Sequence, residues 1–285
     1  MRFRLYCGIV RGGTWYNHAE VIPLEGGVLA MLEGGERTGA ARLLNLMKGS
    51  IKSLYTEDGK EYDLLPDDYL ELRVADTWKI GYEAIKLKTG EQYPVIPESF
   101  FCPRCSTAHN EKYTDVKESW QKLIDEGLID EIFLDEPSFT FEIDLPVPVE
   151  IQANRTIMGG TFDTIIMKHM TLGDMLLLHR NQEAQESQAN SIYATWEMMI
   201  VGVKGLPEKD FNILKRNPGQ SFARKYFSAD ANQEAIGEAI DKNIVGWDDR
   251  DRVVYCRHCG KDLWGGLDVT NFFSPLLPKK SNRNR

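Results

Sequence analysis

Four of the five cysteines form two pairs, and each pair has two residues between its members. The pairs are Cys102 with Cys105 and Cys256 with Cys259. Two intervening residues allow a tight turn to aim both thiolates at one ion, and two such turns supply the four tetrahedral ligands that Zn²⁺ favours. The spacing therefore predicts one four-cysteine zinc site. Because four thiolates leave no open position for a substrate, we expect this site to be structural.

Other chemistries also fit these cysteines. An iron–sulfur cluster takes four thiolates as well, and paired cysteines can instead be redox-active. We favour Zn²⁺ because both the ligand softness and the spacing suit it. His109 or His258 can replace one cysteine, but with four thiolates present we expect both histidines to lie outside the ligand set.

The two pairs are separated by residues 106–255, far more than the roughly 12 to 20 residues that separate the pairs of a compact zinc ribbon. A shared ion would therefore join the first third of the chain to its C-terminal part, and metal loss would be coupled to unfolding. Such pairs indicate metal ligation in a reducing compartment rather than a disulfide framework. The remaining Cys7 is expected to be a small buried side chain.

The sequence contains none of the catalytic motifs G-x-S-x-G, G-x-x-x-x-G-K-[ST] or H-E-x-x-H. The acidic groups at Asp67–Asp68 and Asp248–Asp251 have oxygen ligands that suit Mg²⁺. Carboxylates are also common at solvated turns and helix starts, and we favour that interpretation. The sequence therefore predicts a protein that is not an enzyme.

Composition narrows the class of protein further. With 285 residues and 42% hydrophobic residues, the chain can bury a substantial core. No run approaches the roughly 18 to 20 apolar residues of a spanning helix, so we expect no membrane span. The net charge of −9 opposes binding to a phosphate backbone, although the tail from Lys279 to Arg285 is basic. Nucleic acid is therefore not an expected partner.

Several elements must position the first cysteine pair. Glycine pairs punctuate residues 1–35 and predict strands and turns, beginning with a strand at the N-terminus. Apolar spacing predicts a helix over Thr38–Leu54 and another that begins after Pro66 and ends at Gly81. Strands at Tyr82–Leu87 and Gln92–Ile96 would then form a hairpin leading toward Cys102.

A long strand is the clearest local pattern between the cysteine pairs. Every odd position from Phe139 to Ile151 is apolar, which predicts a half-buried strand. Pro146 and Pro148 cannot donate ladder hydrogen bonds, so we expect an edge strand or a bulge, and an edge is also a docking surface. A turn over Asn154–Gly160 would lead to a strand over Phe162–Met170.

A helix capped by Thr171, with Asp174 in its first turn, should follow that hairpin. Another helix is expected over residues 114–127. From Met175 to Val245 the chain is predicted to be helical, with breaks at residues 205–207 and 217–219. The last apolar stripe in that region runs through Ile192, Trp196, Met199, Ile200 and Val203 and predicts a core-facing helix.

These patterns predict an α+β fold with a β-rich N-terminal part, a β-hairpin, a helical bundle region and a four-cysteine zinc-knuckle site joining distant segments. We divide the chain into four regions. Residues 1–60 form the β-rich part with a helix, and residues 61–135 contain a helix, a hairpin and the first cysteine pair. Residues 136–250 contain the long hairpin and the helical region. Residues 251–285 contain the second cysteine pair and the basic tail.

A series of segments occurs in a characteristic order. The segments are Asp67–Arg73, Cys102–Cys105, the proline-containing strand, Met170–Asp174, Cys256–Gly260 and Asn271–Pro275. In this order the chain resembles the tail baseplate hub and tail assembly proteins of T-even-like contractile-tailed bacteriophages. The resemblance covers about residues 65–277 and does not extend to the first 60 residues.

The resemblance implies a structural protein of the virion tail, assembled in the host cytoplasm at the baseplate hub. Its partners would be other tail and baseplate proteins in a symmetric hetero-oligomeric assembly. A zinc-ribbon protein associated with nucleic acid or transcription is the alternative function, with the same cysteines in its favour and the acidic charge against it.

Overall fold

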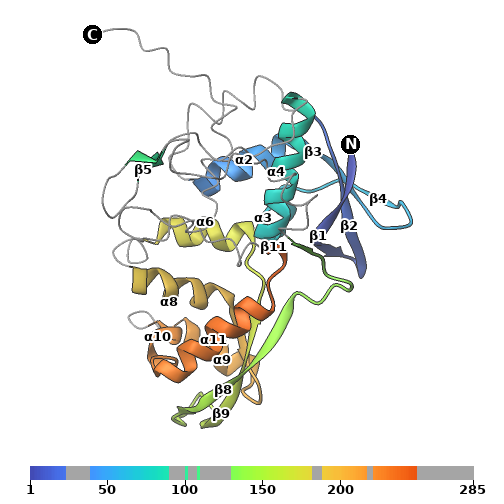
Figure 1. The fold of residues 1–285 in the computed structure, drawn as a ribbon. Helices are drawn as coiled ribbons and strands as arrows, with labels where there is room; N and C mark the ends of the chain where they lie inside the picture. Colours follow the sequence, from blue (N-terminus) through green and yellow to red (C-terminus); the bar gives the residue numbers. More distant parts are fainter. Residues whose placement is uncertain are drawn as a thin grey trace. The chain divides into compact units, whose positions relative to one another are not determined.

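The computed structural model describes residues 1–23, 39–89, 100–101, 108–109, 130–181, 188–216 and 221–248. These residues form helices and antiparallel sheets, which confirms the α+β class (Figure 1). The chain divides into two compact units, each assembled from separate segments. Unit 1 comprises Met1–Tyr69, Ala75–Leu134 and Val245–Arg285, and unit 2 comprises Leu70–Val74 and Asp135–Ile244.

Unit 1 contains a four-stranded antiparallel sheet in the order β1-β2-β3-β4. Its strands are β1 (Arg2–Arg11), β2 (Thr14–Val21), β3 (Ile51–Tyr55) and β4 (Glu61–Tyr62). Gly12 and Gly13 form the β1–β2 turn with φ angles of 56° and 75°, which glycine adopts without a steric penalty. The predicted N-terminal strand is therefore confirmed.

Two of the predicted boundaries in unit 1 are wrong. The helix predicted over Thr38–Leu54 is α2 (Gly39–Ser50), and the chain then continues as β3. Ile51 and Leu54 are three residues apart, a spacing that suits a helix, but β3 pairs with β2 on one side and β4 on the other. Pairing on both sides outweighs the local helical pattern.

The helix predicted to end at Gly81 instead continues to Thr89. After the short helix α3 (Asp68–Glu71), α4 covers Val74–Thr89, so the strand predicted over Tyr82–Leu87 is helical. Four side chains of α4 are fully buried at helical spacing, namely Asp76, Thr77, Ile80 and Ala84. Glycine inside a helix costs only about 1 kcal/mol, and burial of this face offsets that cost.

A buried carboxylate connects α4 to the sheet. Asp76 is 0% exposed, and its two carboxylate oxygens accept hydrogen bonds from the backbone N–H groups of Cys7 and Gly8, each at 2.9 Å. The β1–β2 register shifts between Arg4 and Ile9, which frees this part of β1 from regular pairing. Gly8 has a φ of 70°, and a Cβ there would lie 2.4 Å from the Tyr16 carbonyl oxygen, so only glycine fits.

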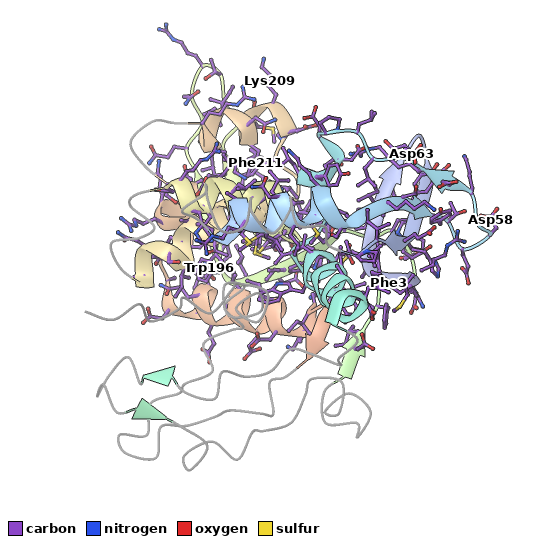
Figure 2. The ribbon with its side chains drawn as sticks, turned by 90° about the horizontal axis from the view of Figure 1, so that it is seen from above. Phe3, Asp58, Asp63, Trp196, Lys209 and Phe211 are labelled. Atoms are coloured by element: carbon purple, nitrogen blue, oxygen red, sulfur yellow. The ribbon has the colours of Figure 1, made fainter. Side chains whose placement is uncertain are left out.

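Unit 2 is built on a three-stranded antiparallel sheet in the order β10-β9-β8. Its strands are β8 (Thr140–Ile151), β9 (Gly160–Lys168) and β10 (Ile200–Val203). Its helices are α6 (Leu172–Arg180), α8 (Gln188–Met199), α9 (Glu208–Lys215), α10 (Phe222–Tyr226) and α11 (Asp230–Lys242). Side chains from all three strands and from α8, α9, α10 and α11 form one core, which includes Trp196 and Phe211 (Figure 2).

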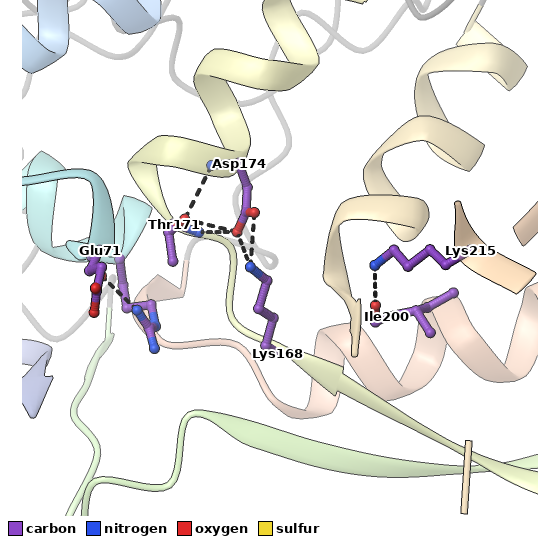
Figure 3. Close-up of polar contacts among 7 residues, drawn as sticks. Glu71, Lys168, Thr171, Asp174, Ile200 and Lys215 are labelled. Atoms are coloured by element: carbon purple, nitrogen blue, oxygen red, sulfur yellow. Dashed lines mark hydrogen bonds and ion pairs between the residues drawn. The ribbon is translucent and has the colours of Figure 1, made fainter. Parts of the chain in front are cut away.

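The hairpin and the following cap are confirmed. β8 lies at an edge of the sheet, and its register with β9 shifts between Asp144 and Val149, around the two prolines. Thr171 caps α6, accepting a hydrogen bond from the Asp174 N–H while the Asp174 carboxylate accepts one from the Thr171 N–H (Figure 3). Lys168 pairs with the same carboxylate at 2.7 Å.

The helical stripe that ends at Val203 is only partly helical, which is a further correction. Trp196 and Met199 belong to α8, but Ile200 and Val203 belong to β10, which pairs with β9. Ile200 and Val203 are buried in the strand, and their pairing with β9 satisfies backbone groups on a side of β9 that would otherwise lack partners. The break predicted at residues 205–207 is confirmed, since α9 begins at Glu208.

Replacing Asp76 with asparagine should destabilise unit 1 by about 3 kcal/mol, because an amide removes the charge and turns a donor toward one of the two buried N–H groups. Urea unfolding followed by circular dichroism measures the change in the free energy of unfolding. Asp67→Asn is the matched control, since Asp67 is exposed. Equal stability of the two variants would contradict a supporting role for Asp76.

Candidate metal centre and hairpin edge

The four predicted ligands, Cys102, Cys105, Cys256 and Cys259, lie outside the described residues. So do His258, the strand predicted over Gln92–Ile96 and the helix predicted over residues 114–127. Their proposed roles remain predictions. Described strands lie next to each cysteine pair in the sequence, two around the first pair and one before the second.

A strand pair flanks the first cysteine pair. β5 (Phe100–Phe101) pairs antiparallel with β6 (Ala108–His109), so that Phe101 lies opposite Ala108. The six residues between these partners include Cys102 and Cys105. The two residues before Cys102, Phe100 and Phe101, are therefore extended. Antiparallel strands on both sides of a C-x-x-C sequence are compatible with a zinc knuckle.

A second strand pair returns the C-terminal part of the chain to unit 1. β7 (Asp130–Ile132) pairs antiparallel with β11 (Gly246–Asp248), and Ile132 lies opposite Gly246. Cys256 follows the end of β11 by eight positions. β7 and β11 also flank the two ends of the long segment Asp135–Ile244 of unit 2. Backbone pairing thus joins a segment that begins 25 residues after Cys105 to one that ends eight residues before Cys256.

Glu131 holds β7 against the rest of unit 1. Its carboxylate accepts hydrogen bonds from the Tyr6 hydroxyl at 2.6 Å and from the Lys79 ammonium at 2.5 Å. Burial, reinforced by this bond to Glu131, raises the pKa of Tyr6 far above its ordinary value. The Tyr6 carbonyl oxygen also accepts a hydrogen bond from the Leu134 N–H at 2.8 Å. One residue of β1 therefore anchors β7 through both its backbone and its side chain.

The fit of β11 depends on one glycine. Gly246 has a φ of 109°, and a Cβ there would lie 3.1 Å from the Ala75 Cβ and 3.8 Å from the Tyr6 ring. The absence of a side chain therefore lets the chain pass close to α4 just before it leads toward Cys256. Nothing in the sequence pattern identified Gly246 as a supporting residue.

Within the described ranges, no three His, Cys, Asp or Glu side chains come together in a way that would hold a metal ion. Cys7 forms no disulfide bond and is fully buried, as expected. Asp68 was expected in a solvated turn or helix start. It does begin α3, but it is 3% exposed, and the expectation of a solvated carboxylate is wrong.

Asp68 is buried because its partners satisfy it. Its carboxylate accepts hydrogen bonds from Arg11 at 2.6 Å, from the Tyr62 hydroxyl at 2.7 Å and from the Leu65 N–H at 2.7 Å. Burial alone would raise the pKa of Asp68, but these three donors outweigh burial and lower that pKa below its ordinary value. Its oxygens are therefore occupied by the protein, which makes Asp68 a structural carboxylate.

β8 lies at the edge of its sheet as predicted, and one side chain covers the centre of that edge. The Val147 N–H donates to the Asn232 side-chain oxygen, and the Val147 carbonyl accepts from the Asn232 amide, both at 2.9 Å. Asn232 lies on α11 and is 1% exposed. Because Pro146 and Pro148 carry no N–H, Val147 supplies the only donor of this stretch, and it is already paired.

A short segment of the chain docks at the other end of the hairpin in unit 2. The Leu172 N–H donates to the Leu72 carbonyl at 2.8 Å, and the Val74 N–H donates to the Met170 carbonyl at 3.0 Å. Between them, the Arg73 guanidinium lies 4.3 Å from the centre of the Phe139 ring. Burial, and then the charge of Arg73, lower the pKa of the adjacent His169 to about 4. His169 is therefore neutral at physiological pH.

Comparisons with known protein families, with curated proteins and with solved structures find no match for this chain. The resemblance to phage tail proteins therefore remains a prediction from the order of the sequence segments. A separate search finds no described helix that is long and apolar enough to cross a membrane.

Asn232→Ala should lower the free energy of unfolding by about 1 to 3 kcal/mol, because it leaves both polar backbone groups of Val147 unpaired beside α11. The Val147 amide should also lose protection from hydrogen exchange. Glu234→Ala is the control on the same helix, since Glu234 is exposed. An unchanged exchange rate at Val147 in Asn232→Ala would show that the amide does not close this edge.

Proposed function

We propose that the protein is a non-enzymatic structural component of a bacteriophage contractile tail, at the baseplate hub or its assembly stage, stabilised by a four-cysteine Zn²⁺ site. The pairing of β7 with β11 is the observation that carries the structural part of this proposal. It returns the chain to unit 1 shortly before Cys256 and Cys259, while β5 and β6 flank Cys102 and Cys105 in the same unit.

The ion would reinforce a junction that backbone pairing already makes. A site shared by both pairs closes the loop of residues 106–255, which includes the whole segment Asp135–Ile244 of unit 2. Closing a long loop lowers the conformational entropy of the unfolded chain and so favours the folded state. Four thiolates would complete the coordination of the ion and leave it no role in binding a substrate.

Metal analysis of the purified full chain should find about one Zn²⁺ per chain, as expected for one site with four thiolates. Cys256→Ser should lose most of this metal and unfold at lower urea concentration. Cys7→Ala is the matched control and should retain the metal, because Cys7 is fully buried in β1. Equal zinc content in wild type and Cys256→Ser would remove Cys256 from the ligand set. Iron and sulfide in place of zinc would assign a cluster instead.

The outer face of the β8–β9 hairpin is the surface of unit 2 that we assign to a partner. Glu142, Asp144 and Glu150 on β8 and Asp163 on β9 are exposed, and only Glu142 pairs with a described cation, Lys204. This face suits a basic surface on a neighbouring tail protein. It replaces the edge of β8 as the contact surface, because Asn232 occupies the centre of that edge.

When the protein is expressed with tail-tube and hub proteins, it should co-purify with at least one of them. Glu150→Lys should weaken that complex about tenfold, since it sets like charges opposite each other. Glu136→Lys is the control, an equal charge change at an exposed position before β8. A monomer that binds no tail component would contradict the proposal. So would a salt-sensitive complex with DNA or RNA, which would favour the zinc-ribbon alternative.

A further inference from the structure

A groove lies on unit 1 where β2 and the β3–β4 turn diverge. His18 of β2 pairs with Tyr55 at the end of β3. Beyond this pair, the first residues of β2 remain paired with β1, whereas Thr56–Lys60 turn into β4. The groove is shallow and open to solvent, with a volume of about 520 Å³. Its lining consists of one aromatic side chain and five polar ones, Thr14, Trp15, Asn17, Thr56, Glu57 and Asp58.

The aromatic wall is held in one orientation. The Trp15 indole N–H donates to the Cys7 carbonyl oxygen at 2.8 Å, so the ring cannot rotate without losing this bond. A Cβ at Gly8 would lie 3.0 Å from the indole nitrogen, which means that the ring rests directly on the bulge of β1. Trp15 is half-buried, and its groove-lining part forms a rigid apolar surface.

The opposite wall is a turn organised by one hydroxyl. Thr56 Oγ1 accepts a hydrogen bond from the Lys60 N–H at 2.9 Å and donates to the Asp58 carboxylate. The Thr56 and Lys60 backbones also bond at 3.0 Å, and Gly59 provides the φ of 91° that the turn requires. Asp58 lies at the tip of this turn (Figure 2). Both walls are therefore preformed, which reduces the entropic cost of binding.

The polar groups around the groove include two carboxylates, one ammonium and two hydroxyls. Glu57 and Asp58 supply carboxylates, but Asp58 already accepts from Thr56. The ammonium group of Lys60 lies 3.5 Å from the Thr14 hydroxyl, at the wall of the groove, and opposes a second positive charge. Lys60 also adds a donor beside the acceptors and hydroxyls. Such a mixture suits a ligand with many hydroxyl groups.

We propose that this groove binds a neutral saccharide. The C–H face of a pyranose ring would stack on Trp15, and its hydroxyl groups would exchange hydrogen bonds with the Glu57 carboxylate, the Thr14 hydroxyl and the Lys60 ammonium. This arrangement combines an apolar surface with a few oriented polar groups, as small-molecule sites generally do. The site is independent of the cysteines and of the proposed role in a phage tail.

Saturation-transfer NMR on the full chain with maltotriose, chitotriose and lactose tests the proposal, since this method detects weak ligands. We expect saturation transfer to at least one of the three. Glu57→Gln should weaken the affinity for that sugar about tenfold, because it removes a charged acceptor. Trp15→Phe should reduce it further. Asp67→Asn, at an exposed position outside the groove, should leave it unchanged.

Two results would overturn the saccharide assignment. One is the absence of transfer to all three sugars, with circular dichroism confirming that the protein is folded. The other is binding that neither Glu57→Gln nor Trp15→Phe weakens, which would place the sugar elsewhere on the chain. Arginine amide serves as the cationic probe. In the first case, Glu57-dependent binding of arginine amide would assign the groove to a cation instead.

Discussion

The carboxylate of Asp76, fully buried and paired with the backbone N–H groups of Cys7 and Gly8, is the contact on which the organisation of unit 1 depends. An ionised group out of contact with water is costly unless hydrogen bonds compensate it, and here two backbone donors do so. In return, two N–H groups that the bulge removes from the β1–β2 ladder find an acceptor. Helix α4 and strand β1 therefore each supply hydrogen-bonding partners for buried polar groups of the other.

The consequences extend along β1 in both directions. Tyr6, directly before the paired N–H groups, binds Glu131 and Leu134 and so anchors β7, and β7 in turn pairs with β11. On the other side, Gly8 leaves room for the Trp15 indole, which donates to the Cys7 carbonyl oxygen. The strand pair that precedes the second cysteine pair and the aromatic wall of the groove thus both depend on the geometry of one bulge.

In unit 2, a side-chain amide rather than a carboxylate pairs with both backbone groups of Val147 in β8. The prolines in β8 interrupt the pairing with β9, and an asparagine from α11 supplies both a donor and an acceptor to Val147. A side-chain amide can pair with a strand as a peptide group does, because it carries both an N–H donor and a carbonyl acceptor. This contact protects the centre of an edge that could otherwise pair with another chain.

Features that depend on residues close together in the chain could be predicted from the sequence. Alternation from Phe139 to Ile151 identified β8, the prolines identified its irregularity, and Thr171 with Asp174 identified a cap, because each pattern involves residues a few positions apart. The C-x-x-C spacing likewise predicts a metal site, whose ligands lie outside the described residues.

Only the tertiary structure decided the conformation of Ile51–Tyr55 and of Tyr82–Leu87, whose apolar spacing suits both a helix and a strand. It also decided the contacts of Asp76 with Cys7 and of Asn232 with Val147, which join residues 69 and 85 positions apart. No local pattern identifies such partners. A buried polar group takes whichever complementary group the fold brings within hydrogen-bonding distance, and the packing of distant segments determines which group that is.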